Sequence, residues 1–175
     1  MPYELNTTLF TDYASKYRVI FLPPTAAGST TAQQAKYQDS RQGITETLFF
    51  PVGTVISKTF TFRKEDADGK LLSENMVETR LLIKRKTTAG DNWVGLPYIW
   101  QKDASGNNTK ALLSLAGGSA SVTWDYVDPN PNVKKNGARA RYTGAATQYT
   151  IPAALDCISC HGGDDREAGS APIGP

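Results

Sequence analysis

Two alternating runs around a hairpin signal place the strongest constraint on the fold of this chain. In "VISKTFTF" (55–62), Val, Ser and Thr would occupy one face of a strand, and Ile, Lys and Phe the other. "NMVETRLLIKRKT" (75–87) alternates in the same way, with Val77 and Glu78 on opposite faces. The intervening "DG" at 68–69 is typical of a tight hairpin turn. Period-two alternation of this composition predicts two long antiparallel strands.

The other extended segments are separated by short polar turns, and helical periodicity is not sustained for three turns anywhere. These segments are "WVGLPYIWQKD" (93–103), "ALLSLAGGSASVTWDYV" (111–127, two strands around Gly117-Gly118) and "ARARYTGAATQYTIP" (138–152). We expect one mainly β domain over residues 1–175, an antiparallel sheet or sandwich-like arrangement with few short helices.

The N-terminal part of the chain has a weaker pattern. "TDYASKYR" (11–18) is compatible with a helical turn capped by Thr11 or Asp12, and "RVIFLPP" (18–24) with an extended segment. Residues 25–43 have the composition of a mobile surface loop.

Charge and hydropathy exclude two classes of partner. The net charge is +2, from 19 basic and 17 acidic residues, and no Lys/Arg-rich run is present. We therefore expect no nucleic-acid binding. The apolar runs are too short to cross a bilayer, and "MPYELNTT" lacks the basic start and apolar core of a signal peptide.

The chain contains only two cysteines and one histidine, and all three lie in "CISCH". C-x-x-C-H is the attachment signal of c-type haem. Cys157 and Cys160 would form thioethers with the two vinyl groups of the haem, and His161 would be the proximal iron ligand. We expect one covalently attached haem c, carried by a C-terminal attachment segment that follows the β body.

Two other chemistries use similar residues. A redox-active C-x-x-C usually opens a helix within a βαβ pattern, which this sequence lacks. A zinc site needs a fourth ligand, for which only carboxylates such as Asp164 and Asp165 are at hand. Haem is therefore favoured over a dithiol or a zinc site. Because covalent haem attachment normally takes place outside the bacterial cytoplasm, we expect a periplasmic or extracellular protein whose export signal has been removed or lies outside this segment.

The common small cytochrome c is helical, with C-x-x-C-H near its N-terminus and a methionine ligand downstream. Here only 14 residues follow His161, and none is methionine. The blocks "YELNTTLFTDYASKYRVIFLPP", "FPVGTVISKTF", "ETRLLIKR", "WVGLPYIWQKD" and "CISCH…PIGP" resemble the C-terminal region of a largely uncharacterised group of bacterial diheme c-type cytochromes. The resemblance covers nearly the whole chain and implies that Cys157, Cys160 and His161 bind haem. Members of that group carry a second haem motif and continue past "PIGP", so we expect this chain to be a domain of a longer protein or a shortened relative.

More distantly, "FPVGTVISKTF" and the late C-x-x-C-H are similar to the β-sheet cytochromes of the c′-beta superfamily. That group includes gas-binding proteins and hydroxylamine-oxidising enzymes. Its enzymes cross-link a lysine to the haem, which draws attention to Lys58 without assigning it that role.

The sixth iron position decides between electron transfer and small-molecule chemistry. With one histidine, bis-His ligation within the chain is excluded. Met76 is the internal methionine and a candidate distal ligand, although methionine in a β core usually fills gaps. Met1, at the terminus, is a poor candidate. An open or water-bound site, a site walled by aromatics, and ligation by lysine, tyrosine or a partner chain remain alternatives.

Other side chains have both a structural and a functional interpretation. Aromatics that could stack on a porphyrin, but are more often ordinary core, are Trp93, Trp100, Trp124, Tyr98 and Phe60. Arginines that could pair with haem propionates are Arg80, Arg139 and Arg141. Acid–base candidates at a reactive haem are Glu78 and Asp156.

The sequence thus predicts a one-electron carrier rather than an enzyme, with redox proteins or neighbouring haem domains as partners. The alternative is an open-site haem oxidoreductase or gas-binding protein.

Overall fold

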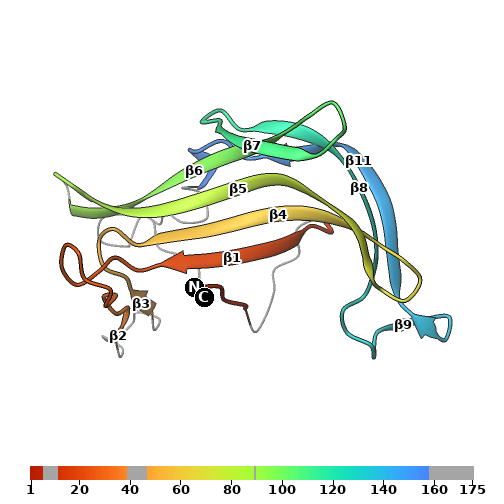
Figure 1. Cartoon of the computed structure of the whole chain (residues 1–175), viewed down its shortest axis with the longest axis horizontal. Coiled ribbons are helices and arrows are strands. Elements are labelled where there is room, and N and C mark those ends of the chain that lie inside the picture. Colours follow the sequence, from red (N-terminus) through yellow and green to blue (C-terminus); the bar gives the residue numbers. More distant parts are fainter. Residues whose placement is uncertain (6–11, 39–46, 89, 158–175) are drawn as a thin grey trace.

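The computed structural model describes residues 1–5, 12–38, 47–88 and 90–157. Within these ranges the chain is almost entirely β (Figure 1). No helix there is long and apolar enough to cross a membrane. The strands are β1 (Ser15–Phe21), β2 (Lys36–Gln38), β3 (Thr47–Phe49), β4 (Val55–Glu65), β5 (Leu71–Thr87), β6 (Gly90–Lys102), β7 (Asn108–Leu113), β8 (Gly118–Val127), β9 (Lys134–Lys135), β10 (Ala138–Arg139) and β11 (Arg141–Ile151).

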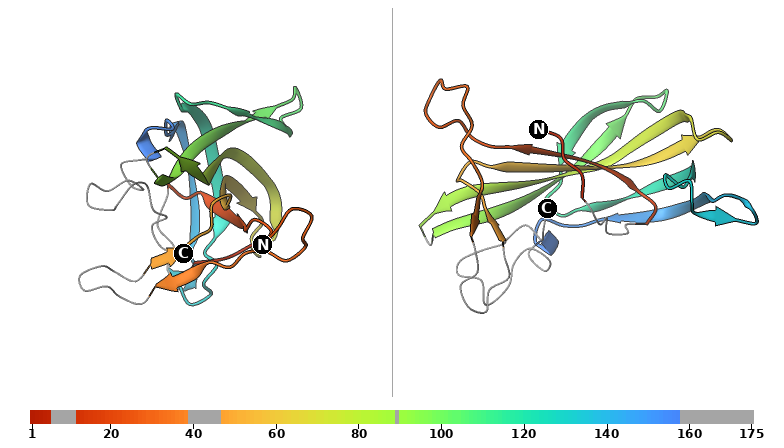
Figure 2. Two further views of the ribbon diagram at one scale, coloured as in Figure 1. Left: turned by 90° about the vertical axis from the view of Figure 1, so that its left-hand side faces the viewer. Right: turned by 90° about the horizontal axis from the view of Figure 1, so that it is seen from below.

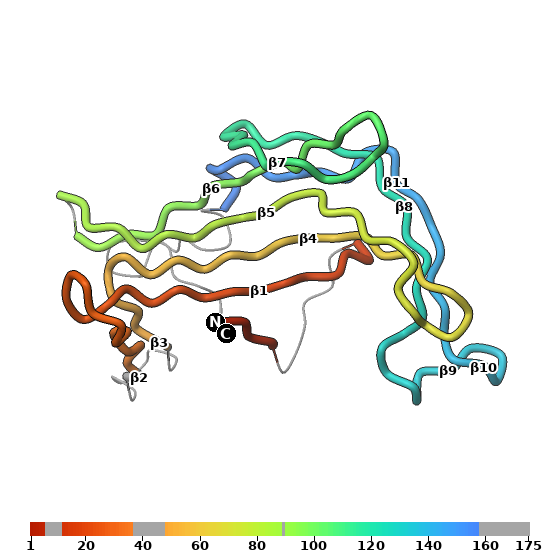
Figure 3. The backbone as a smooth tube through the Cα atoms, viewed as in Figure 1, coloured from red at the N-terminus to blue at the C-terminus, as the bar shows by residue number. Residues whose placement is uncertain are grey.

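The main sheet has seven strands in the order β11-β8-β4-β5-β6-β7, and β1 pairs with β4 outside this path. Strands β4, β5, β6 and β7 form a meander of antiparallel pairs. Strand β1 covers the edge of β4 from Val55 to Thr61. At Lys64 the same edge passes to β8 through a parallel bridge to Asp125. The sheet therefore divides along β4, which lets the β8–β11 pair leave the plane of the others (Figure 3).

The sheet is curled, and the β8–β11 pair returns over one face of the β1–β4–β5–β6 part (Figure 2). The buried core lies in this fold, with Ala14, Ile99, Ala120, Trp124 and Ala146 packed against it. Its members are Phe62, Val77, Val122, Tyr149 and Ile151. We call the face of β1, β4, β5 and β6 that carries Phe60 and looks toward β11 the inner face, and the opposite one the outer face.

Most of the sequence-based expectations on the fold are confirmed. The chain is mainly β, the hairpin at 68–69 joins β4 to β5, and Gly69 has the positive φ of 84° that such a turn requires. The segment 111–127 contains the end of β7 and then β8, separated at Gly117.

The N-terminal expectation of a helical turn at 11–18 is wrong. Asp12 and Tyr13 form a turn with positive φ, and a strand begins at Ser15. The physical reason is that β4 has an edge open for pairing, and all of residues 15–21 form a strand along it instead of a helical turn. In the region 25–43, a backbone hydrogen bond runs from the amide of Thr25 to the carbonyl of Thr31, and β2 pairs with β3. Residues 39–46 lie outside the described ranges, so mobility of this loop stays a prediction.

Candidate functional site

The segment that carries Cys157 is fixed to the sheet immediately after β11. The amide of Ala154 donates to the carbonyl of Leu115, and the Asp156 carboxylate accepts from the amide of Ala153. Gly117, at φ 69°, lies so close to this segment that a Cβ there would be 2.7 Å from the Ala153 nitrogen. The β7–β8 turn therefore determines where the chain leaves β11. The Asp156 carboxylate, an acid–base candidate from the sequence, thus caps this turn.

Cys157 lies on the inner face of the sheet, directly over Gly95 of β6. A Cβ at Gly95 would come within 2.8 Å of the Cys157 Sγ atom, so only glycine leaves room for the cysteine. Burial raises the pKa of the Cys157 thiol. Cys160 and His161, the other two residues of the motif, lie outside the described residues, as do Asp164 and Asp165. Among the residues described, no group of three or more His, Cys, Asp or Glu could hold a metal ion.

Gly95 belongs to a cross-strand row that is mostly apolar. The pairing registers place Ile20, Ile56, Leu82 and Gly95 opposite one another on β1, β4, β5 and β6. Directly paired residues share a face of the sheet, so this row continues the surface on which Cys157 lies.

The next row along the same strands is cationic. Arg18 pairs with Lys58, and Lys58 pairs with Arg80, so three cations on three neighbouring strands share the inner face. Burial, and then Arg18 and Arg80, lower the pKa of Lys58. Burial lowers the pKa of Lys16 to about 8, and the charges of Arg18, Lys58 and Arg80 act in the same direction. Cross-strand pairs of like charge are destabilising, so this row is an unusual feature for a sheet.

A buried carboxylate partly offsets the row. Glu78 is fully buried, and its two oxygens accept hydrogen bonds from Arg80 Nε at 2.8 Å and Arg80 Nη2 at 2.7 Å. The Tyr149 hydroxyl, from β11, donates to Glu78 Oε1 at 2.7 Å. Burial, and then the negative charge of Glu78, raise the pKa of Tyr149 well above its ordinary value. The Arg80 guanidinium also lies 4.3 Å from the centre of the Phe60 ring, a favourable stacking contact.

Met76 lies on the other side of the sheet. A β-bulge between Phe60 and Thr61 leaves Val77 unpaired, so Phe60 pairs with Glu78 and Thr61 with Met76. Because successive residues of β4 point to opposite faces, Glu78 is on the inner face and Met76 on the outer one. The structure therefore does not bring Met76 to the face that carries Cys157.

The aromatic candidates divide among three places. Phe60 and Trp93 lie on the inner face, where Trp93 packs edge-on against Phe50. Trp100 and Tyr98 lie on the outer face, where the Trp100 indole donates to Thr79 Oγ1 at 3.0 Å. Trp124 packs in the β8–β11 arm, stacked on Tyr13 with ring centroids 5.0 Å apart.

The three arginine candidates are also separated. Arg80 belongs to the cationic row beside Cys157. Arg141 binds Asp125 at 2.6 Å and the carbonyls of Glu65 and Asp66, and Arg139 binds the carbonyl of Asp128. Arg139 and Arg141 thus stabilise the end of the molecule around the β4–β5 hairpin, away from Cys157.

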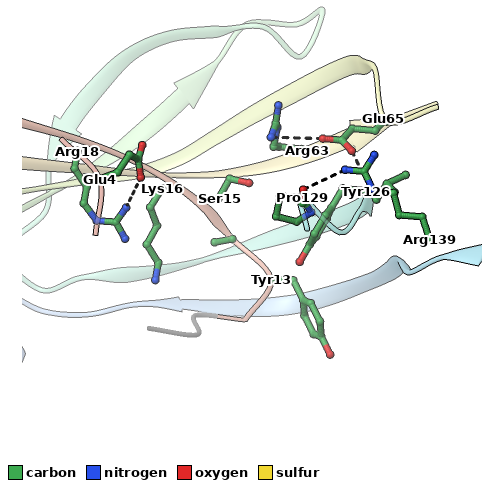
Figure 4. Close-up of a pocket in the computed structure, with 13 residues that line it drawn as sticks. Glu4, Tyr13, Ser15, Lys16, Arg18, Arg63, Glu65, Tyr126, Pro129 and Arg139 are labelled. Atoms are coloured by element: carbon green, nitrogen blue, oxygen red, sulfur yellow. Dashed lines mark hydrogen bonds and ion pairs between the residues drawn. The ribbon is translucent and has the colours of Figure 1, made fainter. Parts of the chain in front are cut away.

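A pocket of about 560 Å³ opens beside the start of β1 (Figure 4). Lys16 and Arg18 line one side, and Arg63 and Glu65 of β4 line another. Glu65 accepts from the amide of Val127 at 3.0 Å and lies 3.5 Å from Arg63, so its charge has partners. Cys157 does not line this pocket. The pocket is a polar opening next to the cationic row.

Sequence reasoning missed three residues of the inner face, Lys16, Arg18 and Gly95, and Tyr149 of β11, which reaches that face. The alternation of Lys16 and Arg18 at positions i and i+2 was visible in "SKYRVIF", but it was hidden by the helical interpretation of that segment. No local signal in the sequence points to Gly95 or Tyr149. Gly95 meets Cys157, and Tyr149 meets Glu78, only because β11 folds back over the inner face.

Comparisons with protein-family models, curated proteins and solved structures found no match for this chain. The resemblance to diheme cytochromes therefore stays a prediction that depends on the sequence blocks quoted above.

Proposed function

We propose that this protein binds one haem c covalently and carries single electrons outside the cytoplasm. Cys157 and Cys160 would hold the haem, and His161 would be its proximal iron ligand. One observation carries the proposal: the chain's whole supply of cysteine and histidine forms C-x-x-C-H directly after β11, with Cys157 seated over Gly95.

The inner face has the properties that such a cofactor needs. The bound haem would supply the one-electron redox centre. The apolar row from Ile20 to Gly95 would exclude water from the ring, and the buried Glu78–Arg80 pair would hold a guanidinium in a fixed position beside it. A rigid, partly desolvated surrounding favours electron transfer because little has to rearrange when the iron changes charge.

The partners would be redox proteins or neighbouring haem domains. This part of the proposal follows from the sequence resemblance to diheme cytochromes, in which a second haem motif lies outside the matching region. The location would be the periplasm or the cell exterior, where thioether attachment takes place.

A pyridine haemochrome spectrum tests the proposal. The chain is exported together with a bacterial haem-attachment system, purified under denaturing conditions and compared with the Cys157→Ala/Cys160→Ala variant. We expect about one haem c per chain in the parent protein and no covalent haem in the double variant. Absence of haem c from the exported parent protein would show that the proposal is wrong.

An open-site haem protein is the second candidate, and the position of Met76 favours it. Among the described residues the inner face beside Cys157 presents no histidine or methionine, so neither of the usual sixth ligands of a cytochrome c is supplied there. A high-spin ferric spectrum with rapid CO binding to the ferrous form would support this candidate. A low-spin spectrum with no CO binding would support the electron carrier.

A further inference from the structure

The cationic row on the inner face carries more positive charge than the described residues around it neutralise. Its three cations are Arg18, Lys58 and Arg80, and the positive charges of Arg18 and Arg80 lower the pKa of Lys58. Among the described residues, Glu78 and Glu4 are the carboxylates that form ion pairs with these three side chains, through Arg80 and Arg18 respectively. Three positive charges against two negative charges leave an excess of one.

The pairing within the row is uneven. Glu78 is fully used by Arg80 and Tyr149. Glu4 is largely exposed and lies 3.6 Å from Arg18 Nη1, which is long for an ion pair of this kind. No hydrogen bond or ion pair joins the Lys58 ammonium, at the centre of the row, to another described residue.

A second and independent observation concerns Arg18. Its side chain is only 3% exposed, yet its Nε atom has no hydrogen-bond partner. A buried donor without a partner costs about 1–3 kcal/mol, and native structures contain few of them. A buried guanidinium with an open donor, next to an unpaired ammonium, is the arrangement expected of a site that completes its hydrogen bonds with an anion.

The position of the row indicates what kind of anion fits. Arg80 is on the strand next to Gly95, and its charge affects Cys157 directly. With strands about 4.8 Å apart and alternate residues about 6.7 Å apart, Lys58 lies about 12 Å from Gly95. The adjacent row of Ile20, Ile56 and Leu82 is apolar. The combined surface suits a flat apolar body with two acidic groups at one edge.

We propose that Arg18, Lys58 and Arg80 form a dicarboxylate-binding site that holds the two propionates of the haem attached at Cys157. This inference rests on the proposed function for its ligand, while the site itself rests on the geometry of the described residues. Lys16, from the same face, adds positive charge and lies beside the opening shown in Figure 4. A free dicarboxylate is the other source of the same chemistry.

The test compares haemin with haemin dimethyl ester, in which both propionates are neutral. The full chain with Cys157→Ala and Cys160→Ala retains His161 and is titrated with each compound by absorbance. We expect haemin to bind about tenfold tighter than the diester. Lys58→Gln should remove most of that preference, and Arg18→Gln should do the same. Lys110→Gln, which removes an exposed lysine on β7, is the control for net charge and should leave the preference unchanged.

Equal binding of haemin and its diester, or equal preferences in Lys58→Gln and Lys110→Gln, would overturn the inference. Lys58 holds no other described side chain in place, so its variant is expected to fold; circular dichroism and thermal melting check this for each variant.

A second measurement separates the two sources of dicarboxylate. The melting temperature of the same chain is followed with succinate against chloride of equal ionic strength. One outcome would assign the site to a free dicarboxylate and overturn the propionate assignment. In that outcome, succinate raises the melting temperature, Lys58→Gln abolishes this rise, and haemin binds no tighter than its diester. Covalent haem in the exported protein without any haemin preference would leave the proposed function standing and reject this inference, so the two failures are distinguishable.

Discussion

Glu78 is a buried carboxylate whose hydrogen-bond partners come from β5 itself and from β11. Taking a carboxylate out of water costs several kcal/mol unless it is paired and fully hydrogen-bonded. Arg80 and Tyr149 meet this requirement, and the Tyr149 hydroxyl ties the β8–β11 arm to the inner face. The network therefore joins Arg80, whose charge acts on Cys157, to β11, the strand that leads to Cys157.

Removing either end of this network should destabilise the fold. We expect Glu78→Ala to lower the free energy of unfolding by about 3 kcal/mol, because it leaves Arg80 unpaired. Tyr149→Phe should cost about 1.5–3 kcal/mol, because the buried Glu78 loses a hydrogen bond. Urea unfolding followed by tryptophan fluorescence measures both. Tyr142→Phe is a matched control, since the Tyr142 hydroxyl donates to the less buried Asp128. A cost for Tyr149→Phe no larger than for Tyr142→Phe would contradict the assignment.

Lys16 should make stability depend on pH in the alkaline range. Its pKa is about 8 in the folded protein, against the ordinary value of 10.5 in the unfolded chain. The unfolded chain therefore binds more protons between these values, so the contribution of Lys16 to stability rises as pH increases from about 8 to 10.5. The charges of Arg18, Lys58 and Arg80 act on Lys16, and its ammonium lies 5.9 Å from the centre of the Phe60 ring.

The measurement is the free energy of unfolding of the haem-free parent and of Lys16→Met at pH 7 and pH 9.5. The gain in stability of the variant over the parent should be largest at pH 7 and smaller at pH 9.5. Lys110→Met serves as a control in which the difference does not change with pH. A difference for Lys16→Met that stays constant across this range would show that Lys16 is not electrostatically strained.

At the scale of the elements, the bulge in β5 decides which side chains of that strand share the inner face with Cys157. Regular alternation along β5 would place Met76 on the same face as Glu78 and Arg80. Because Val77 is unpaired, Met76 moves to the outer face and Val77 joins the core with Phe62. Bulges redirect side chains in this way without interrupting the strand. The expected alternation of β4 is confirmed over 55–62, whereas that of β5 is wrong at Val77.

The bulge leads to a spectroscopic prediction. In the haem-loaded protein, Met76→Ala should leave the visible spectrum, including any methionine-to-iron band, unchanged, because a side chain on the outer face cannot reach the iron. His161→Gly is the positive control. It should alter the Soret band of the same protein, because it removes the proposed proximal ligand. Loss of a methionine-to-iron band in Met76→Ala would show instead that Met76 is the distal ligand.

At the scale of the whole molecule, the curl of the sheet brings residues from the two ends of the chain, Arg18 and Cys157, to one face of the sheet. Arg18 is far from Cys157 in sequence, yet it lies on the same inner face, on β1, three strands from the β6 strand over which Cys157 lies. The division of the sheet at Lys64 lets β8 and β11 turn back over that face and carry Cys157 to Gly95. The candidate site is thus a product of topology rather than of one segment.

The sequence by itself determined the features that depend on near neighbours in the chain. Alternation gave the β4–β5 hairpin and the mainly β class, because a strand's two faces repeat every two residues. The spacing of Cys157, Cys160 and His161 gave the haem prediction, because attachment chemistry needs those residues within five positions.

Only the tertiary structure decided which residues share a face with Cys157. The row of Arg18, Lys58 and Arg80 depends on strand register, and the seat at Gly95 depends on the return of β11. Register and strand order follow from long-range burial and hydrogen bonding, which a local pattern does not contain. The same physical reason explains the two local errors: an open β4 edge turned 15–21 into a strand, and a single unpaired valine moved Met76 to the other side of the sheet.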